Sequence, residues 1–228
     1  MRIYLIRHAS PDYETDTLTP AGREEGRALV TYLQTLGVDE IYASPYGRTR
    51  ETAQIAGDAL GLRVQVEEWA RELPEEFITL FNQALLDSGG GSERSSALRH
   101  WESWPAFAVP IIASTMARIG EGADRLLEQH GLSRREGGYY VKQENTKRLA
   151  IFTHMGVVQA CLAHLLQAPL PFVWSGFHVY PASITTILFE EHAPDMVVAR
   201  CAGMSDVAYL SAAGLQPNPI GLSLNGDS

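Results

Sequence analysis

Two arginines and two histidines stand in sequence contexts that suit phosphoryl-transfer chemistry: Arg7, His8, Arg48 and His154. A transferred phosphoryl group carries negative charge on its equatorial oxygens, so catalysis of its transfer is mostly positioning and electrostatic stabilisation. Arginine suits that task because its guanidinium fork matches phosphate geometry and stays charged at any working pH. A neutral histidine can act as the nucleophile that accepts the phosphoryl group. The four residues together predict a phosphate-handling pocket.

A glutamate, Glu72, completes this set. Each residue taken singly also has an ordinary structural explanation. Arg48 could be a solvated residue at a helix start, His154 a hydrogen-bonded structural histidine, and Glu72 a solvated loop carboxylate. Ser10 and Asp12 lie near the first histidine and could touch substrate, although loop polarity explains them equally well. The combination favours a catalytic site because it contains every part that phosphoryl transfer needs.

Short apolar runs rich in strand-forming residues alternate with helix patterns along the chain. The runs cover residues 3–6, 40–43, 64–66, 149–153, 184–189 and 196–199. After the first run, Thr19 is placed to cap a helix that begins at Pro20, and Gly37 is placed to end it. A second helix follows residues 44–45 and stops at Gly61. This alternation predicts an α/β fold, a three-layer αβα sandwich with a mostly parallel sheet and a helical insertion.

The candidate residues fall at the ends of these strand-like runs. Arg7 and His8 close the first run, and Arg48 lies in the link from the second run to its helix. Glu72 follows the third run, and His154 links the fourth run to the next helix. Ligands of open α/β sheets bind at the carboxyl ends of the strands. We therefore expect all five side chains around one pocket.

The alternation stops between residues 73 and 147, where we expect a helical insertion that could cap the site. The insertion contains an apolar stripe at helical spacing: Ile112, Met116, Ile119, Ala123 and Leu126. Its glycine triplet at 89–91 favours a flexible linker, because no Gly-Lys-Ser/Thr follows to make a phosphate loop. A further group of polar and aromatic residues could line a cap pocket or pack inward: Arg94, Arg99, His100, Trp101 and Trp104.

The length and composition indicate one domain. The chain has 228 residues, of which 45% are apolar, enough for one sizeable core. We expect a single domain over residues 1–213 that includes the insertion at 73–147. Residues 214–228 are rich in Gly, Pro, Asn and Ser and predict a flexible tail.

Charge and cysteine content exclude several function classes. A formal net charge of −9 argues against nucleic-acid and anionic-membrane partners, which need a basic surface. Cys161 and Cys201 have no ligand-like spacing, and no other cluster has it, so we expect no disulfide, metal or other cofactor. The apolar run at 3–6 is too short for a signal segment and no stretch is long enough to span a membrane, which predicts a cytoplasmic protein. The oligomeric state stays open.

Four segments, in order along the chain, carry a resemblance to a known family. They are Leu5-Ile6-Arg7-His8, Leu18-Thr19-Pro20-Ala21-Gly22, the stretch from Ser44 to Ala53, and Phe152-Thr153-His154-Met155-Gly156. They resemble the Arg-His-Gly motif, the Leu-Thr-x-x-Gly helix start, the Ser-Pro-Leu-x-Arg-Ala-x-Gln-Thr-Ala motif and the second-histidine motif of the histidine phosphatase superfamily, also called phosphoglycerate mutase-like.

The resemblance implies a role for each candidate residue. His8 becomes phosphorylated, Arg7, Arg48 and His154 form the phosphate pocket, and Glu72 donates the proton. The family uses no metal.

The sequence departs from the family pattern at several positions. Ala9 and Met155 stand where glycine is usual, and Thr49 and Glu51 replace Ala and Gln on the second helix. None of these changes removes a charged group that the chemistry needs. The stretch after Glu72 lacks the glycine-containing tract often seen there.

The expected activity is hydrolysis of a small-molecule phosphomonoester through a phosphohistidine on His8. A cofactor-dependent phosphoglycerate mutase is the first alternative, although Glu75 and Glu76 stand where mutases hold a second anionic group with basic residues. A catalytically idle module that binds a phosphorylated or protein partner is the second. For catalysis His8 must be neutral, while His154 serves best as an imidazolium.

Overall fold

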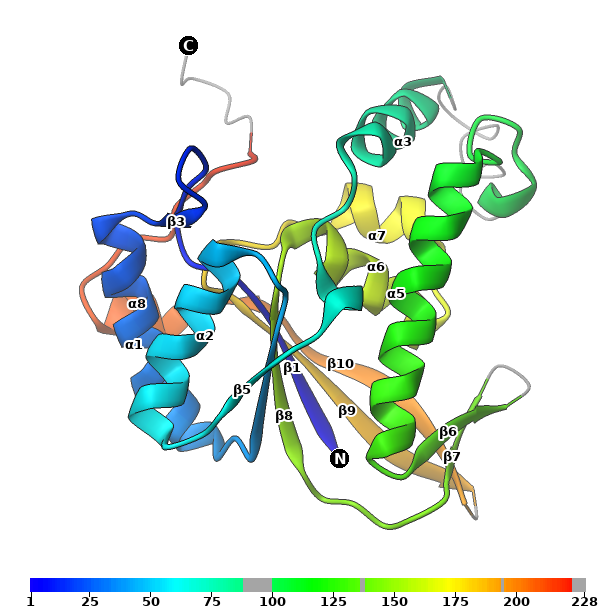
Figure 1. Cartoon of the computed structure of the whole chain (residues 1–228). Helices are drawn as coiled ribbons and strands as arrows, with labels where there is room; N and C mark the ends of the chain where they lie inside the picture. Colours follow the sequence, from blue (N-terminus) through cyan, green and yellow to red (C-terminus); the bar gives the residue numbers. More distant parts are fainter. Residues whose placement is uncertain (88–99, 136–137, 194, 223–228) are drawn as a thin grey trace.

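A central sheet lies between two groups of helices (Figure 1). The computed structural model of the chain describes residues 1–87, 100–135, 138–193 and 195–222. One side of the sheet carries α1 (Pro20–Leu36), α2 (Gly47–Leu60) and α8 (Ala208–Ala212), and the other carries α5 (Pro110–Gln129), α6 (Met155–Leu166) and α7 (Leu170–Gly176). The predicted three-layer αβα sandwich is confirmed.

The sheet has eight strands in the described residues, in the order β5-β4-β8-β1-β9-β10-β7-β6. In that order they are Val64–Val66, Glu40–Ala43, Arg148–Thr153, Arg2–Arg7, Ile184–Ala193, Met196–Asp206, Gly138–Val141 and Leu132–Arg135. The pairings from β5 to β1 are parallel, and those from β1 to β6 are antiparallel. Only β9 and β7 therefore run against β1, so the sheet is mostly parallel, as expected.

The first strand is buried on both faces, as its apolar run predicts. Ile3 and Leu5 point into the core under α5 and α6, while Tyr4 and Ile6 point into the core under α1 and α2. Each is at most 2% exposed. Burial of such a side chain stabilises a fold by about 1.5–3 kcal/mol. The strand end that carries His8 is thus held from both sides.

The helix boundaries follow the local signals. The Thr19 hydroxyl accepts a hydrogen bond from the Gly22 N–H at 3.0 Å, and Pro20 is the first residue of α1. Gly37 ends that helix at φ 65° and Gly61 ends α2 at φ 68°. These left-handed conformations suit glycine, which has no Cβ to clash.

The segment 73–147 is only partly helical. It contains α3 (Glu75–Asp87), the 3₁₀ turn η2 (Trp101–Ser103) and α5, followed by the hairpin of β6 and β7, which extends the sheet. The expectation of a helical insertion did not include this hairpin, because its four-residue strands leave no long apolar run. β7 pairs with β10, and β6 pairs with β7. The apolar stripe of α5 is buried as expected at Ile112, Ile119, Ala123 and Leu126. The glycine triplet, Arg94 and Arg99 lie outside the described residues.

A short hairpin follows the first strand, and the described part of the expected tail returns to it. The hairpin consists of β2 (Pro11–Asp12) and β3 (Thr17–Leu18). Asn218 Nδ2 donates to Ser10 Oγ at 2.9 Å, so this part of the tail contacts the domain. No helix in the described ranges has the length and hydropathy needed to cross a membrane.

Candidate active site

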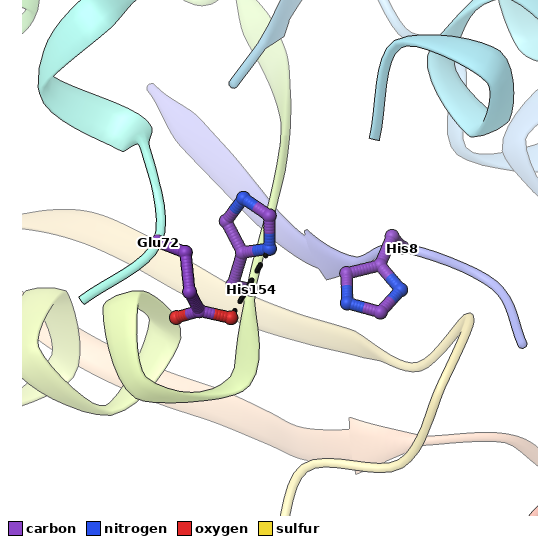
Figure 2. Close-up of side chains that lie close together, drawn as sticks. All are labelled: His8, Glu72 and His154. Atoms are coloured by element: carbon purple, nitrogen blue, oxygen red, sulfur yellow. Dashed lines mark ion pairs between the residues drawn. The ribbon is translucent and has the colours of Figure 1, made fainter. Parts of the chain in front are cut away.

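The carboxyl ends of β1 and β8 bring two histidines together (Figure 2). His8 directly follows β1 and His154 directly follows β8, and their ring centroids lie 5.3 Å apart. Glu72 reaches the same place from the loop after the 3₁₀ turn η1 (Glu68–Ala70), with Oε2 3.2 Å from His154 Nδ1. Both histidines are at most 1% exposed. The structure therefore places two buried histidines and the partly buried Glu72 in one cluster, although the three are far apart in sequence.

Two buried arginines border this cluster. Arg7 Nη1 donates to the Val179 carbonyl at 2.6 Å, and Arg48 Nη2 lies 3.2 Å from His154 Nδ1 and 3.8 Å from Glu72 Oε2. The Nε atoms of both arginines are buried and have no hydrogen-bond partner among the described residues. Buried donors are almost always paired in proteins, so two unpaired donors on cationic groups point to an anion as their natural partner.

His8 has the tautomer that a nucleophile needs. Its Nδ1 lies 2.8 Å from the Ala9 carbonyl oxygen, which can only accept, so Nδ1 carries the hydrogen. The lone pair is then on Nε2. Burial, together with the charges of Arg7 and Arg48, lowers the pKa of His8 to about 3 against the opposing effect of the Ala9 hydrogen bond. His8 is therefore neutral near neutral pH.

The surroundings of His154 also favour its neutral form. Burial, then His8 and the cationic groups Arg48, Arg7 and Arg118, holds its pKa well below the usual value. The expectation of an imidazolium at His154 did not include desolvation, which opposes the charged form. A bound phosphate dianion would favour the charged form, since opposite charge nearby raises a histidine pKa. Its Nε2 lies 2.8 Å from Ser44 Oγ.

Glu72 has the properties of a proton donor. Burial raises the pKa of its carboxyl, while the Leu73 N–H and nearby arginines oppose this shift. The Leu73 N–H donates to Oε1 at 2.9 Å, and the Thr153 hydroxyl donates to the Ala70 carbonyl at 2.8 Å. The carboxyl of Glu72 is therefore held by the N–H of the next residue, and the backbone before it is tied to β8.

Ser10 and Asp12, the two further candidates, make structural contacts. The Ser10 hydroxyl is buried and donates to Glu25 Oε1 at 2.6 Å, while its N–H donates to Oε2 at 2.7 Å. Asp12 Oδ1 accepts from the Glu14 N–H at 3.0 Å and caps the exposed β2–β3 turn. These contacts explain both residues without substrate.

Three residues of the site were not expected from the sequence. Asp16, in the β2–β3 turn, accepts from Arg48 Nη1 at 2.5 Å and from the Gly47 N–H at 2.6 Å. The rings of Tyr13 and Tyr46 lie 5.4 Å and 4.7 Å from the Arg48 guanidinium. Tyr46 stands within the Ser-Pro-Tyr-Gly-Arg motif, which could have pointed to it, whereas nothing local marks Asp16.

His100 and Trp101 line a cavity of about 730 Å³ between η2, α5 and the end of α6. None of the five candidate site residues, Arg7, His8, Arg48, Glu72 and His154, lines this cavity. His100 and Trp101 thus belong to a separate cavity. Trp104 is partly buried and packs against the core.

The cluster could in principle hold a metal ion. His8, Glu72 and His154 each offer one ligand-type atom, and these atoms lie within 4.8 Å of one another. The Arg48 guanidinium lies 3.2 Å from His154 Nδ1 and 3.8 Å from Glu72 Oε2. A metal ion bound to these two residues would therefore lie beside a positive charge, and like charges at such distances repel. The donors fit a cation poorly, and the surrounding charge favours an anion.

The family model of the histidine phosphatase superfamily (branch 1) matches residues 3–201. The chain belongs to this superfamily. A provisionally named phosphoserine phosphatase 2 from Hydrogenobacter thermophilus is 26% identical over 206 residues, which is 86% of this chain and 93% of the relative. A provisionally named phosphoglycerate mutase from Enterobacter sp. is 26% identical over 152 residues, 58% of this chain and 71% of the relative. The chain is therefore similar in sequence both to a protein named as a phosphatase and to one named as a mutase.

Solved structures share the histidine phosphatase fold. A phosphoserine phosphatase of Entamoeba histolytica, crystallised with phosphoserine, superposes with a TM-score of 0.62 at 21% identity, covering 92% of this chain and 98% of that one. A mycobacterial glucosyl-3-phosphoglycerate phosphatase gives 0.61 at 21% identity, with 90% and 98% covered. These likenesses show the fold. The superfamily and its members indicate phosphatase or mutase activity.

Proposed function

We propose that this histidine phosphatase hydrolyses small-molecule phosphomonoesters through a phosphohistidine on His8. One observation carries the proposal: a neutral histidine with a free Nε2 lone pair lies in a buried site where Arg7 and Arg48 have unpaired Nε donors. A nucleophile and an anion site are thus side by side. The reaction needs neither metal nor organic cofactor, since the two guanidinium groups supply the positive charge.

The first half of the reaction transfers the phosphoryl group to the enzyme. His8 Nε2 attacks phosphorus in line, the P–O ester bond breaks, and Glu72 gives its proton to the departing alkoxide. Arg7 and Arg48 hold the equatorial oxygens. His154 takes a proton from solvent as the phosphate dianion binds, keeps it through both transfers, and returns it to solvent when inorganic phosphate leaves. Such fixed donors stabilise the charge of the transition state with little reorganisation.

The second half returns the enzyme to its starting state. The Glu72 carboxylate takes a proton from water, the water oxygen attacks phosphorus, and the P–N bond to His8 breaks. Inorganic phosphate leaves, Glu72 is protonated again and His8 is neutral. One ester and one water give one alcohol and one phosphate.

Phosphatase activity is favoured over mutase activity by the charge beside the site. Glu75 and Glu76 begin α3 directly after the Glu72 loop, and both are exposed. A mutase must hold a substrate with a second anionic group, and carboxylates at this point repel one.

Substitution of the nucleophile tests the proposal. His8→Ala should abolish release of phosphate from p-nitrophenyl phosphate, while His192→Ala, at an exposed position of β9, should leave the rate unchanged. A circular dichroism spectrum equal to wild type would show that the variant is folded. Hydrolysis by folded His8→Ala at the wild-type rate would refute the proposal.

A further inference from the structure

The loop before Glu72 is held by an arginine from a helix far along the chain. Arg118, on α5, donates through Nη1 to the Trp69 carbonyl at 2.5 Å and to the Arg71 carbonyl at 3.0 Å. Nη1 has two N–H bonds, so each can serve one carbonyl. Arg71 directly precedes Glu72, and the last peptide before the acid is thereby fixed.

The Ala70 carbonyl, which lies between the Trp69 and Arg71 carbonyls in sequence, has a hydrogen-bond partner on another element. The Ala70 carbonyl accepts from the Thr153 hydroxyl, which lies at the end of β8 next to His154. Three successive carbonyls of this loop are thus bonded to side chains from α5 and β8 rather than to backbone. The position of Glu72 relative to His154 therefore depends on these two side chains.

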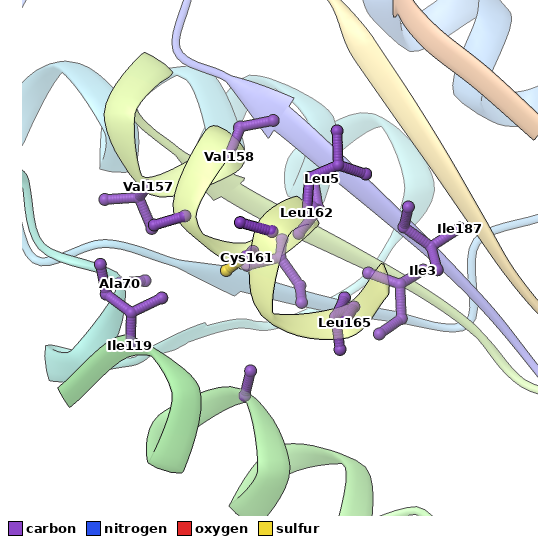
Figure 3. Packing of buried hydrophobic residues seen from close by; sticks show 14 of the residues in the cluster. Ile3, Leu5, Ala70, Ile119, Val157, Val158, Cys161, Leu162, Leu165 and Ile187 are labelled. Carbon is purple, nitrogen blue, oxygen red and sulfur yellow. The ribbon is translucent and has the colours of Figure 1, made fainter. Parts of the chain in front are cut away.

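Packing holds the same loop against α5. Figure 3 shows Ala70 beside Ile119, and both are buried in the same core. Gly122, one turn beyond Arg118, lies so close to the Trp69 ring that a Cβ there would be 2.2 Å from Trp69 Cγ. Arg118 and Gly122 therefore contact Trp69 from one face of the helix, through its backbone and its ring.

Arg118 also contributes to the electrostatics of the site. Burial raises the pKa of Glu72, and the charges of Arg48, Arg7 and Arg118 lower it in part. Arg118 is half-buried, and its Nη2 has no hydrogen-bond partner in the described parts of the chain. Its charge therefore acts on Glu72 from α5, while the other two arginines come from β1 and α2.

We propose that Arg118 is a positioning residue that fixes the Glu72 carboxyl for proton transfer to the leaving group. This inference rests on the proposed function, because Arg118 acts here only through the general acid. A purely stabilising role would make the same contacts, but it would not make the effect of Arg118 depend on the leaving group.

The leaving group separates the two roles. Arg118→Met keeps the length of the side chain but removes its charge and donors. It should lower kcat for an alkyl phosphate about 10- to 100-fold, because small misplacement of a catalytic group costs up to that much. The loss on p-nitrophenyl phosphate should be much smaller, since nitrophenolate leaves without a proton. Arg118→Lys keeps the charge and donors and should recover part of the alkyl-phosphate rate. Arg125→Met is the control, because Arg125 is exposed on the same helix.

A double substitution completes the test. When Glu72→Gln has removed the acid, Arg118→Met should cause no further loss on the alkyl phosphate. An undiminished further loss in the Glu72→Gln background, or equal loss on both substrates in the single variant, would overturn the inference. If Arg118→Met fails to fold, Arg118→Lys gives the same comparison on a smaller scale, and an equal loss of rate relative to wild type on both substrates would again overturn the inference. The proposed function fails separately, if His8 carries no phosphoryl group.

Discussion

Replacement of Glu72 by Gln should change which substrates the enzyme can hydrolyse. The amide keeps the shape of the carboxyl and can still accept the Leu73 N–H bond that Oε1 now accepts at 2.9 Å. Its NH₂ group can donate to His154 Nδ1, which Oε2 now approaches to 3.2 Å. The site should therefore keep its geometry and lose only the transferable proton.

The size of the effect depends on the leaving group. Proton donation to a basic alkoxide contributes about 10²- to 10⁴-fold, which corresponds to about 3–5 kcal/mol of barrier. Arg7, Arg48 and His154 are untouched, so stabilisation of the phosphoryl oxygens remains. A nitrophenolate is already stable as an anion, and its departure should slow less than about threefold.

The assay compares kcat on an alkyl phosphate and on p-nitrophenyl phosphate for wild type, Glu72→Gln and Glu68→Gln. Glu68 is exposed and lies four residues earlier on η1, so its substitution controls for loss of one negative charge near the loop. Equal losses on both substrates would show a structural or electrostatic role. Unchanged rates on both would refute the assignment and move the proton-donor role to Asp12, Glu75 or Glu76.

Three further predictions concern pH, metal and product. The pKa of His8 is about 3 in the folded protein and about 6.5 in the unfolded chain. Between these two pH values the unfolded chain binds a proton on His8 that the folded protein does not. The contribution of His8 to stability is therefore complete above pH 6.5 and falls by about 1.4 kcal/mol per pH unit as the pH drops below it. His8→Ala should therefore lose about 2 kcal/mol less than wild type between pH 7 and pH 5 in urea unfolding, and parallel losses would contradict the shifted pKa. Excess EDTA should leave the hydrolysis rate unchanged, whereas a loss that added metal restores would indicate a different class of enzyme. Phosphate should be released from simple monoesters with little interconversion of phosphoglycerates, even with the bisphosphate primer, and efficient interconversion would favour a mutase.

Most of the fold could be predicted because its signals are local. Thr19 and Gly37 mark the ends of α1 by capping chemistry, and the runs at 3–6 and 149–153 mark strands by their apolar content. The hairpin of β6 and β7 has no such run, and its strands are defined by pairing with the distant β10.

The site could be predicted only where its residues stand at strand ends. Arg7, His8 and His154 follow directly from the strand-end rule for α/β sheets. Asp16 contacts Arg48 from a turn, and Arg118 contacts the backbone before Glu72 from the middle of a helix. Both are tertiary contacts that no local pattern encodes. The protonation of His154 could not be predicted either, because it depends on desolvation and on four neighbouring cations or imidazoles.

Trapping of the phosphorylated enzyme tests the central claim most directly. Wild type mixed with a ³²P-labelled phosphomonoester and quenched during turnover should carry an acid-labile, base-stable label that peptide mapping places on His8, and folded His8→Ala should carry none. A label on another residue, or turnover by His8→Ala at the wild-type rate, would contradict the mechanism.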